Sequence, residues 1–504
     1  MRIRLFLVLL AWLAAGLGAT AARAAIDPAL VARLAAEDND EKVAAIAAIV
    51  ATGDPDAERL LKSLADGELR HEGQEITLNN RVRRELEGAM AALRLFAPEV
   101  EVRRRAVKEL ASGAEDSLLP LVRKALEREA DAALRADLQL IAAGLELKSG
   151  DKAVRLAAVR LLATSSSPAV KTLLLPLVEK SEPDEDVRRA ATDSLKLVEA
   201  RLARANFAGL VFSGVSLGSI LLLAALGLAI TYGLMGVINM AHGELIMIGA
   251  YTTYVVQNLF RSYAPGAFDA YLLCAVPAAF VVSAAVGMAL ERSVIRWLYG
   301  RPLETLLATW GLSLILIQAV RTIFGAQNVQ VENPSFMSGG VEIFTGIVLP
   351  WSRIVIIAFA GAVLVLVGVL LARTRLGLFV RGVTQNRAMA ACVGVPTARV
   401  DTWAFGLGSG LAGLAGCALS QIGNVGPDLG QAYIVDSFMV VVLGGVGQLA
   451  GTVYAALGLG FANKLLENWQ GAVIAKIVVL LFIIAFIQKR PQGLFALKGR
   501  AVEA

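Results

Sequence analysis

The residues best suited to chemistry lie in one glycine-rich stretch, from Tyr232 to Glu244. Asn239, His242 and Glu244 bring an amide, an imidazole and a carboxylate close together at the edge of an apolar run. Ionisable groups beside apolar segments usually have a function or a specific partner. Two interpretations are open: these groups line a transport path, or they satisfy a helix end and a neighbouring carbonyl. We expect Asn239 to cap the helix that follows.

The rest of the sequence contains few residues or motifs typical of an enzyme. The sequence holds only two histidines. It contains no G-x-x-x-x-G-K-[ST] loop for ATP phosphates, no H-E-x-x-H motif and no G-x-S-x-G motif. We therefore expect a chain that is not an enzyme, with no catalytic residues, metal or cofactor of its own.

A second polar segment, Arg381–Pro396, is expected to lie between two apolar spans. Thr384 can cap a short helix, and Gly394 followed by Pro396 marks its end. Helical spacing gives this helix an apolar face with a basic flank. Such a helix suits insertion into the groove of a partner, and a helix lying on lipid is the alternative. The apolar face comprises Met389, Cys392 and Val393, and the basic flank comprises Arg381 and Arg387.

Composition places both segments in a membrane protein. The chain has 504 residues, of which 56% are hydrophobic and only 18% are charged, more apolar than an ordinary soluble protein. Residues 206–504 carry the apolar segments and a basic excess. The orientation of membrane segments explains this excess more simply than binding to nucleic acid, which we do not expect. The predicted spans are 208–235, 243–260, 270–290, 303–323, 352–372, 402–422, 434–446, 450–463 and 471–488.

The seventh and eighth spans are short and glycine-rich, around Gly444, Gly445 and Gly447. They are either separate half-helices or one broken helix. Irregular backbone at membrane depth occurs only where protein or a water-filled path covers it, so these glycines are further candidates for the path. Counting nine spans leaves Arg292 and the basic tail after Gln488 on one side, as the positive-inside rule requires, which favours separate segments.

The first part of the chain has the features of an exported region. Residues 1–25 resemble a signal peptide, with an uncleaved anchor as the alternative. Residues 26–205 are rich in Ala, Leu, Arg and Glu, and their recurring pattern resembles HEAT-type repeats of stacked helices. The region is either a docking surface for an exported partner or a structural spacer. The similar stretches begin at Val102, Val154 and Val187.

Four segments of the second half closely resemble the permease family of branched-chain amino-acid and urea ABC importers. The resemblance covers roughly residues 207–497, and its INxAHGE-like and LGGxG pieces are fairly specific. The four segments are Tyr232–Glu244, Arg381–Pro396, Asp436–Gly447 and Arg490–Phe495.

Membership of that family implies several partners. They are a second, homologous permease subunit, two cytoplasmic ATPase subunits that bind the ATP, a periplasmic substrate-binding protein and the surrounding membrane lipid. Residues 381–395 would be the coupling helix against the ATPase. Residues 239–244 and 443–447 would flank the path.

Within the family, two features resemble the urea-type permease: the exported extension, and the amino-acid sequence of residues 384–390 and 436–439. Urea is therefore the expected substrate, and branched-chain amino acids are the alternative. A neutral solute fits spans in which Glu244 and Lys476 are the only expected buried charges. Zwitterionic amino acids remain possible substrates, because their charges can pair with helix ends. A different class of function is that of a membrane-anchored scaffold or receptor, but such a protein rarely needs nine membrane spans.

The sequence thus predicts an all-α chain. A polytopic helical domain would lie in the bacterial inner (plasma) membrane, with the exported repeat domain in the periplasm and the carboxyl terminus in the cytoplasm.

Overall fold

The computed structural model describes residues 28–36, 38–52, 55–71, 74–111, 116–165, 167–178, 182–344 and 347–495. The predicted signal peptide lies outside these residues. The chain divides into two compact units, Met1–Leu202 and Ala203–Ala504, and the boundary falls within the helix α11 (Glu185–Met235).

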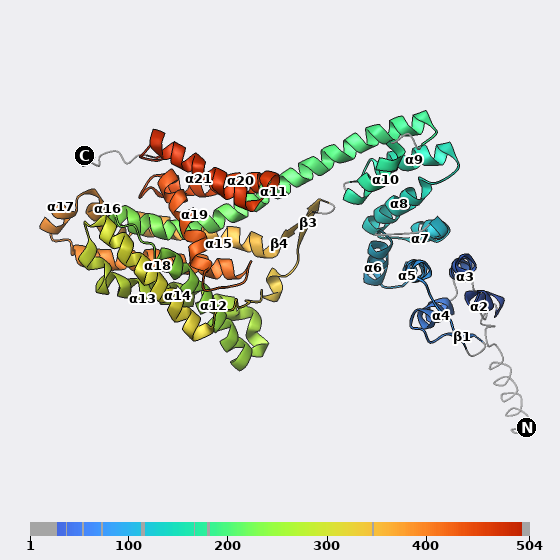
Figure 1. The fold of residues 1–504 in the computed structure, drawn as a ribbon, viewed down its shortest axis with the longest axis horizontal. Coiled ribbons are helices and arrows are strands. Elements are labelled where there is room, and N and C mark those ends of the chain that lie inside the picture. Colours follow the sequence, from blue (N-terminus) through green and yellow to red (C-terminus); the bar gives the residue numbers. More distant parts are fainter. Residues whose placement is uncertain are drawn as a thin grey trace, which may run out of the picture. The chain divides into compact units, whose positions relative to one another are not determined.

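The first unit consists mainly of short helices that follow one another along the chain (Figure 1). Buried alanine, valine and leucine side chains form its two core clusters. Helices α4 and α10 begin at Pro55 and Pro168, and the Asp151 carboxylate caps α9 by accepting from the Ala153 N–H at 2.8 Å. The elements are α2 (Pro28–Leu34), α3 (Asn39–Thr52), α4 (Pro55–Ala65), β1 (Arg70–His71), β2 (Gln74–Glu75), α5 (Asn80–Arg94), α6 (Val100–Ala111), η1 (Asp116–Leu118), α7 (Leu119–Arg128), α8 (Ala132–Glu146), α9 (Lys152–Leu162) and α10 (Pro168–Val178).

An arginine recurs at equivalent places in the similar stretches of this unit. Each guanidinium donates to a backbone carbonyl six residues earlier. Arg103 also pairs with Glu129 at 2.8 Å, and Arg155 pairs with Glu182 at 3.0 Å. Both carboxylates are buried, so these pairs fix successive helices together. The three arginine-to-carbonyl bonds are Arg103 to Ala97, Arg155 to Ser149 and Arg188 to Glu182.

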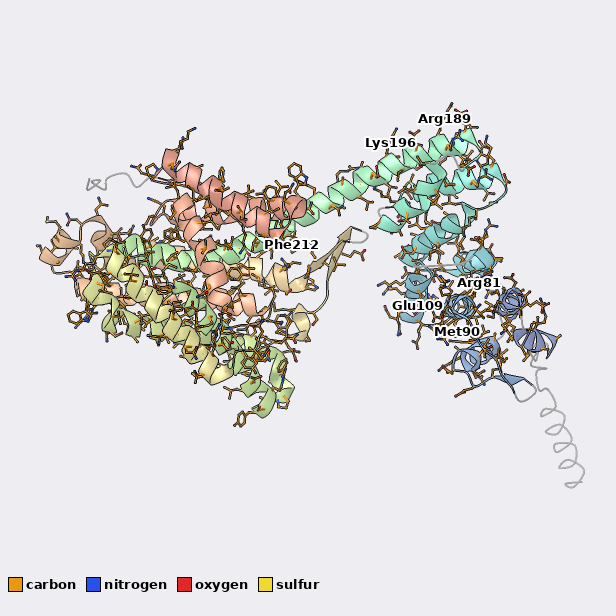
Figure 2. The ribbon with its side chains drawn as sticks, in the orientation of Figure 1. Arg81, Met90, Glu109, Arg189, Lys196 and Phe212 are labelled. Carbon is orange, nitrogen blue, oxygen red and sulfur yellow. The ribbon has the colours of Figure 1, made fainter. Side chains whose placement is uncertain are left out.

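Charged side chains on the outside of the unit form weaker pairs. Arg81 on α5 pairs with Asp40 at 2.9 Å, and both side chains are exposed. Arg189 and Lys196 lie along α11 (Figure 2) and pair with acidic residues of the same helix. Exposed pairs contribute little free energy because water and salt screen them. Removing one partner of a buried arginine pair should therefore cost more stability than removing one partner of an exposed pair, because it leaves a buried charge unpaired.

The second unit is a bundle of long apolar helices (Figure 1), and each of the nine predicted spans coincides with one of them. Among the described residues, seven helices are long and apolar enough to cross a membrane; α12 and α19 fall outside that set. The predicted all-α polytopic membrane fold is confirmed. After α11, these helices are α12 (His242–Tyr263), α13 (Tyr271–Ser293), α14 (Pro302–Phe324), α15 (Trp351–Arg373), α18 (Thr397–Ser420), α19 (Leu429–Gly444), α20 (Leu449–Gln470) and α21 (Ala472–Lys489).

Shorter elements connect the long helices. The β3–β4 hairpin is antiparallel, with Val341 opposite Leu349. The connecting elements are η2 (Pro265–Ala270), η3 (Ile295–Leu298), η4 (Ser335–Met337), β3 (Gly340–Phe344), β4 (Ile347–Pro350), α16 (Arg375–Gln385) and α17 (Arg387–Cys392).

The glycine-rich region around residue 445 joins two separate helices, α19 and α20. The first has 16 residues and the second has 22. Between them, Gly445 (φ +101°) and Gly447 (φ +79°) adopt the left-handed conformation that glycine tolerates best. The structure therefore has the split arrangement rather than one broken helix.

Helix α18 forms the centre of the bundle because its glycines allow close packing against α12 and α13. A Cβ atom on Gly416 would lie 1.9 Å from the Ile246 carbonyl oxygen, and one on Gly413 would lie 2.4 Å from that of Ala279. The apolar part of α18 is 89% buried, against 22% for α15 and 17% for α21. The outer helices α15 and α21 therefore present most of their apolar surface outward.

The polar segment between α14 and β3 is fixed to neighbouring helices by hydrogen bonds. The Tyr271 hydroxyl donates to the Glu332 carbonyl at 2.7 Å, and the Glu332 N–H donates to the Gln257 side chain at 2.7 Å. Val329 and Val425 exchange backbone hydrogen bonds at 2.8 Å. This segment therefore closes over α12, α13 and the end of α18.

Candidate functional site

A non-helical break separates α11 from α12. Helix α11 ends at Met235 and α12 begins at His242. Gly236 has φ +65°, in the left-handed region. The backbone N–H of Met240 donates to the Thr309 hydroxyl of α14 at 3.2 Å. Irregular backbone inside a helical membrane bundle is tolerated where protein or a water-filled path covers it.

Asn239 supports this break without capping α12. Its Oδ1 accepts from the Ala241 N–H at 3.1 Å, and the N-cap position belongs to Ala241 itself. The prediction that Asn239 caps the helix is therefore wrong, because a turn at residues 240–241 places it two residues too early. The side chain is buried, and its Nδ2 has no hydrogen-bond partner among the described residues.

His242 is completely buried and lies against α11. Its Nε2 is 3.0 Å from the Ala224 carbonyl oxygen. Because a carbonyl only accepts hydrogen bonds, Nε2 must carry a proton. Nδ1 has no partner among the described residues. The imidazole thus satisfies a neighbouring carbonyl, as one of the two sequence interpretations expected, and keeps one free nitrogen.

Glu244 lies against the centre of α14. It is 1% exposed, and its Oε1 accepts from the Ser313 hydroxyl at 2.8 Å. Ser313 is the middle residue of α14 (Pro302–Phe324), whose 23 residues suffice to cross the roughly 30 Å hydrocarbon core. The carboxylate therefore lies close to mid-depth of the bundle. Its Oε2 has no partner among the described residues.

Unpaired polar atoms recur along the same side of α12. Tyr251 follows Glu244 by two helical turns, and its buried hydroxyl also has no partner among the described residues. Its ring packs on Phe324 of α14, with centroids 4.7 Å apart. Buried polar atoms without partners are rare and cost free energy. Their concentration between α12 and α14 suits a ligand with hydrogen-bonding groups of its own.

Of the three candidate glycines, only Gly447 packs beside the break. A Cβ atom on Gly233, near the end of α11, would lie 2.6 Å from the Gly447 Cα. Gly444 instead packs against α20, and a Cβ atom on Gly445 would lie 2.4 Å from the Phe495 carbonyl oxygen. Gly444 and Gly445 thus close a turn with the carboxyl-terminal residues.

The predicted short helix exists as α17, but Asn386 caps it. The Asn386 side chain accepts from the Met389 N–H at 2.9 Å. Thr384 lies in the last turn of α16, where its hydroxyl donates to the Val380 carbonyl at 2.8 Å. The prediction of a Thr384 cap is therefore wrong, because that hydroxyl is satisfied within the preceding helix. Helix α17 ends before Gly394 (φ +86°), as predicted.

The apolar face of α17 is exposed on the second unit. Met389 is 61% exposed, Val393 is 75% exposed, and Cys392 is also exposed. Ala390 is buried against the unit. The three apolar side chains are thus free for a partner or for lipid.

The two basic residues of this segment bind within the chain. Arg381 Nε donates to the Gly377 carbonyl of its own helix at 3.3 Å. Arg387 forms an ion pair with the buried Asp401 of α18, and its guanidinium carbon lies 5.1 Å from the Tyr299 ring centroid. Arg387 therefore positions α17.

A second buried ion pair adjoins this one, and the sequence did not predict it. Glu291 is fully buried and pairs with Arg296 at 3.2 Å. It also accepts from the Tyr299 hydroxyl at 3.1 Å and from the Thr402 hydroxyl at 2.7 Å. The Glu291 carboxylate raises the pKa of the Arg296 guanidinium, and burial raises the pKa of the Tyr299 hydroxyl. The only sequence signal was an acidic residue at the end of an apolar span.

The buried charges differ from those expected. Lys476 is 57% exposed and pairs at 3.4 Å with Asp436, which is buried. Glu291 and Asp401 are buried as well as Glu244. The expectation that Glu244 and Lys476 are the only buried charges is therefore wrong, because three further carboxylates turn inward while the cations that pair with them stay partly exposed.

The apolar bundle defines a polytopic membrane protein, and its buried break is the candidate transport site. Comparison with known proteins identifies the family: residues 210–487 match the model described as "Branched-chain amino acid transport system / permease component". The chain belongs to this family of ABC importer permeases, which work with ATPase subunits and a binding protein. No solved structure matches the chain.

Curated relatives agree with this assignment. The chain is 28% identical over 288 residues to the high-affinity branched-chain amino acid permease BraD of Pseudomonas aeruginosa, covering 56% of this chain and 93% of the relative. It is 29% identical over 291 residues to LivH of Escherichia coli K12, covering 56% and 94%. The ribose import permease RbsC of Escherichia coli K12 is 26% identical over 232 residues, covering 43% and 70%.

Proposed function

We propose that this chain lines the substrate path of an ATP-driven importer, with branched-chain amino acids as its substrate class. The observation that carries the proposal is the buried break between α11 and α12 with the first turn of α12, where Asn239 and Glu244 keep polar atoms without partners among the described residues. The names of the matched relatives favour the substrate class. The energy comes from partner ATPases, because this chain has no phosphate-binding loop.

The chemistry of the break suits a small solute that carries both donors and acceptors. Glu244 Oε2 can accept from an ammonium group, and Asn239 Nδ2 can donate to a carboxylate. These contacts replace the solute's lost hydration at mid-depth. When the ATPases close, movement of the helices around the break would expose the site to the opposite side of the membrane.

Urea is the second candidate, and one observation favours it. The family match begins at residue 210, so the helical first unit has no counterpart in that match. Such an extension resembles the urea-type permease. Urea also carries N–H donors and a carbonyl acceptor, so the groups at the break fit it too.

The proposal includes an orientation and a set of partners. The first unit lies in the periplasm as an exported HEAT-like domain, and the basic tail after Gln488 lies in the cytoplasm. Met389, Cys392 and Val393 of α17 insert into a groove of an ATPase subunit. A homologous second permease, a second ATPase and a periplasmic binding protein complete the importer.

Uptake of labelled leucine and labelled urea by a deletion strain tests the proposal. Restoring the gene should restore leucine uptake, and Glu244→Gln should lower it by about tenfold because a charged hydrogen bond to the substrate is lost. Glu304→Gln is the matched control, since Glu304 is an exposed residue at the start of α14. Restoration of urea uptake alone would favour the second candidate, and restoration of neither would refute the proposed function.

A further inference from the structure

The charged cluster beside α17 joins that helix to the break. We propose that Arg387 and Tyr299 are positioning residues that transmit movement of α17 to the break between α11 and α12. The inference rests on the proposed function, in which α17 contacts the ATPase. Three successive contacts support it.

The first contact fastens α17 to the start of α18. Both terminal nitrogens of Arg387 bind the Asp401 carboxylate, one of them at 3.3 Å. The Asp401 side chain is 1% exposed, whereas that of Arg387 is 42% exposed. A two-point guanidinium–carboxylate contact fixes orientation as well as distance. Arg387 is the first residue of α17, so a shift of this helix would pull directly on α18.

The second contact is through Tyr299. Its ring lies under the Arg387 guanidinium, and its hydroxyl donates to Glu291 at 3.1 Å. The same carboxylate accepts from Thr402, the neighbour of Asp401, at 2.7 Å. One tyrosine thus touches both ion pairs, so α17, α18 and the end of α13 are joined through buried polar contacts.

The third contact reaches the break itself. The Met235 sulfur lies 3.0 Å from the Tyr299 hydroxyl oxygen, and Met235 is the last residue of α11. Val237, inside the break, belongs to a buried cluster with Ile295 and Phe405, against which Tyr299 also packs. A displacement of Tyr299 would therefore also move Met235, at the end of α11, and Val237, two residues further along the chain.

A purely structural role is the competing explanation, since buried ion pairs are costly to disrupt whatever they do. The two roles differ in one measurable ratio. A structural role changes how much complex assembles, and leaves substrate transported per ATP unchanged in the complexes that form. A transmitting role lowers that ratio.

The test uses the complete importer, with both permeases, both ATPases and the binding protein, in liposomes. Hydrolysis and uptake are measured on the same vesicles. Tyr299→Phe keeps the ring under Arg387 and removes the hydroxyl, and Arg387→Met removes the cation. The matched controls are Tyr263→Phe, at the exposed end of α12, and Arg375→Met, at the exposed start of α16.

We expect substrate transported per ATP to fall about tenfold in Arg387→Met and about threefold in Tyr299→Phe, since the second variant loses a single hydrogen bond. The controls should match the wild type. An unchanged ratio in Tyr299→Phe, in a preparation where the wild type transports, overturns the inference. If Arg387→Met does not assemble, Tyr299→Phe alone decides.

A second readout separates this inference from the choice of substrate. A thiol is placed in the break by Met240→Cys in a chain whose Cys274 and Cys417 are replaced by serine. Cys392 is kept because it belongs to the face of α17 that contacts the ATPase, and the same chain without Met240→Cys corrects for its labelling. Adding ATP should change the labelling rate of this thiol, and Tyr299→Phe should remove that change. Labelling that responds equally to ATP with and without the Tyr299 hydroxyl overturns the inference even if the transported solute is neither leucine nor urea.

Discussion

Replacing Gly416 with alanine should destabilise the centre of the bundle. The added Cβ atom would lie 1.9 Å from the Ile246 carbonyl oxygen and 2.8 Å from the Ala250 nitrogen. It would therefore meet a backbone hydrogen bond of α12. Carbon and carbonyl oxygen normally approach no closer than about 3.3 Å, so the helices would have to separate by about 1.4 Å.

The expected cost follows from the rigidity of what the methyl group meets. Overpacking a core costs about 1–3 kcal/mol, and the upper part of that range applies here because backbone atoms cannot rotate away. Alanine favours the helix over glycine by about 1 kcal/mol, which offsets part of this packing cost. We therefore expect a net loss of about 1–2 kcal/mol from these two terms.

Thermal unfolding of the purified chain in detergent, followed by tryptophan fluorescence, measures this effect. Gly361→Ala and Gly368→Ala on α15 are matched controls, since their added Cβ atoms would meet nothing within 4 Å. Both controls should unfold at or above the wild-type temperature, and Gly416→Ala clearly below it. Equal midpoints for Gly416→Ala and the controls would refute the close packing of α12 against α18.

Three further outcomes are expected. Hydrogen bonding to Arg103 holds the pKa of Glu129 below its usual value, so this pair stabilises the first unit above the unfolded-state pKa. That stability is lost as pH falls through the lower folded-state value, and Glu129→Gln should flatten the acid side of a hydrogen-exchange pH profile. Met389→Asp should release the ATPase subunits but retain the sister permease; normal ATPase association would show that α17 lies on lipid. Protease added to spheroplasts should remove residues 26–205 and leave the tail after Gln488 intact, and a tail cut from outside would contradict the orientation.

Local sequence signals predicted the helices well because they depend on neighbours in the chain. Apolar length gave the positions of the nine bundle helices, and the glycines at 445 and 447 gave the turn between α19 and α20. The same kind of signal placed the end of α17 at Gly394. Cap positions were less secure, since Thr384 and Asn386 are both good caps and only the length of α16 decides between them.

Contacts between distant residues could not be read from the sequence. Glu244 meets Ser313 across 69 positions, and Thr402 meets Glu291 across 111. Each pairing depends on the packing of whole helices, which a single sequence does not specify. The sequence left open, for the same reason, whether Glu244 lines a path or satisfies a helix end. Asp401 was missed because a carboxylate at the start of a span looks exposed until its helix is placed in the bundle.

The contact between the carboxyl-terminal residues and the α19–α20 turn bears on how the chain is synthesised. The backbone N–H groups of Leu494 and Phe495 donate to the carbonyls of Leu443 and Gly444, at 2.9 Å and 3.3 Å. During translation residues 443 and 444 are made about 51 positions before these donors. The turn therefore lacks these two hydrogen bonds until residues 494 and 495 have been made. A chain truncated after α21 would hold all the long helices of the described residues yet leave the Leu443 and Gly444 carbonyls without these donors.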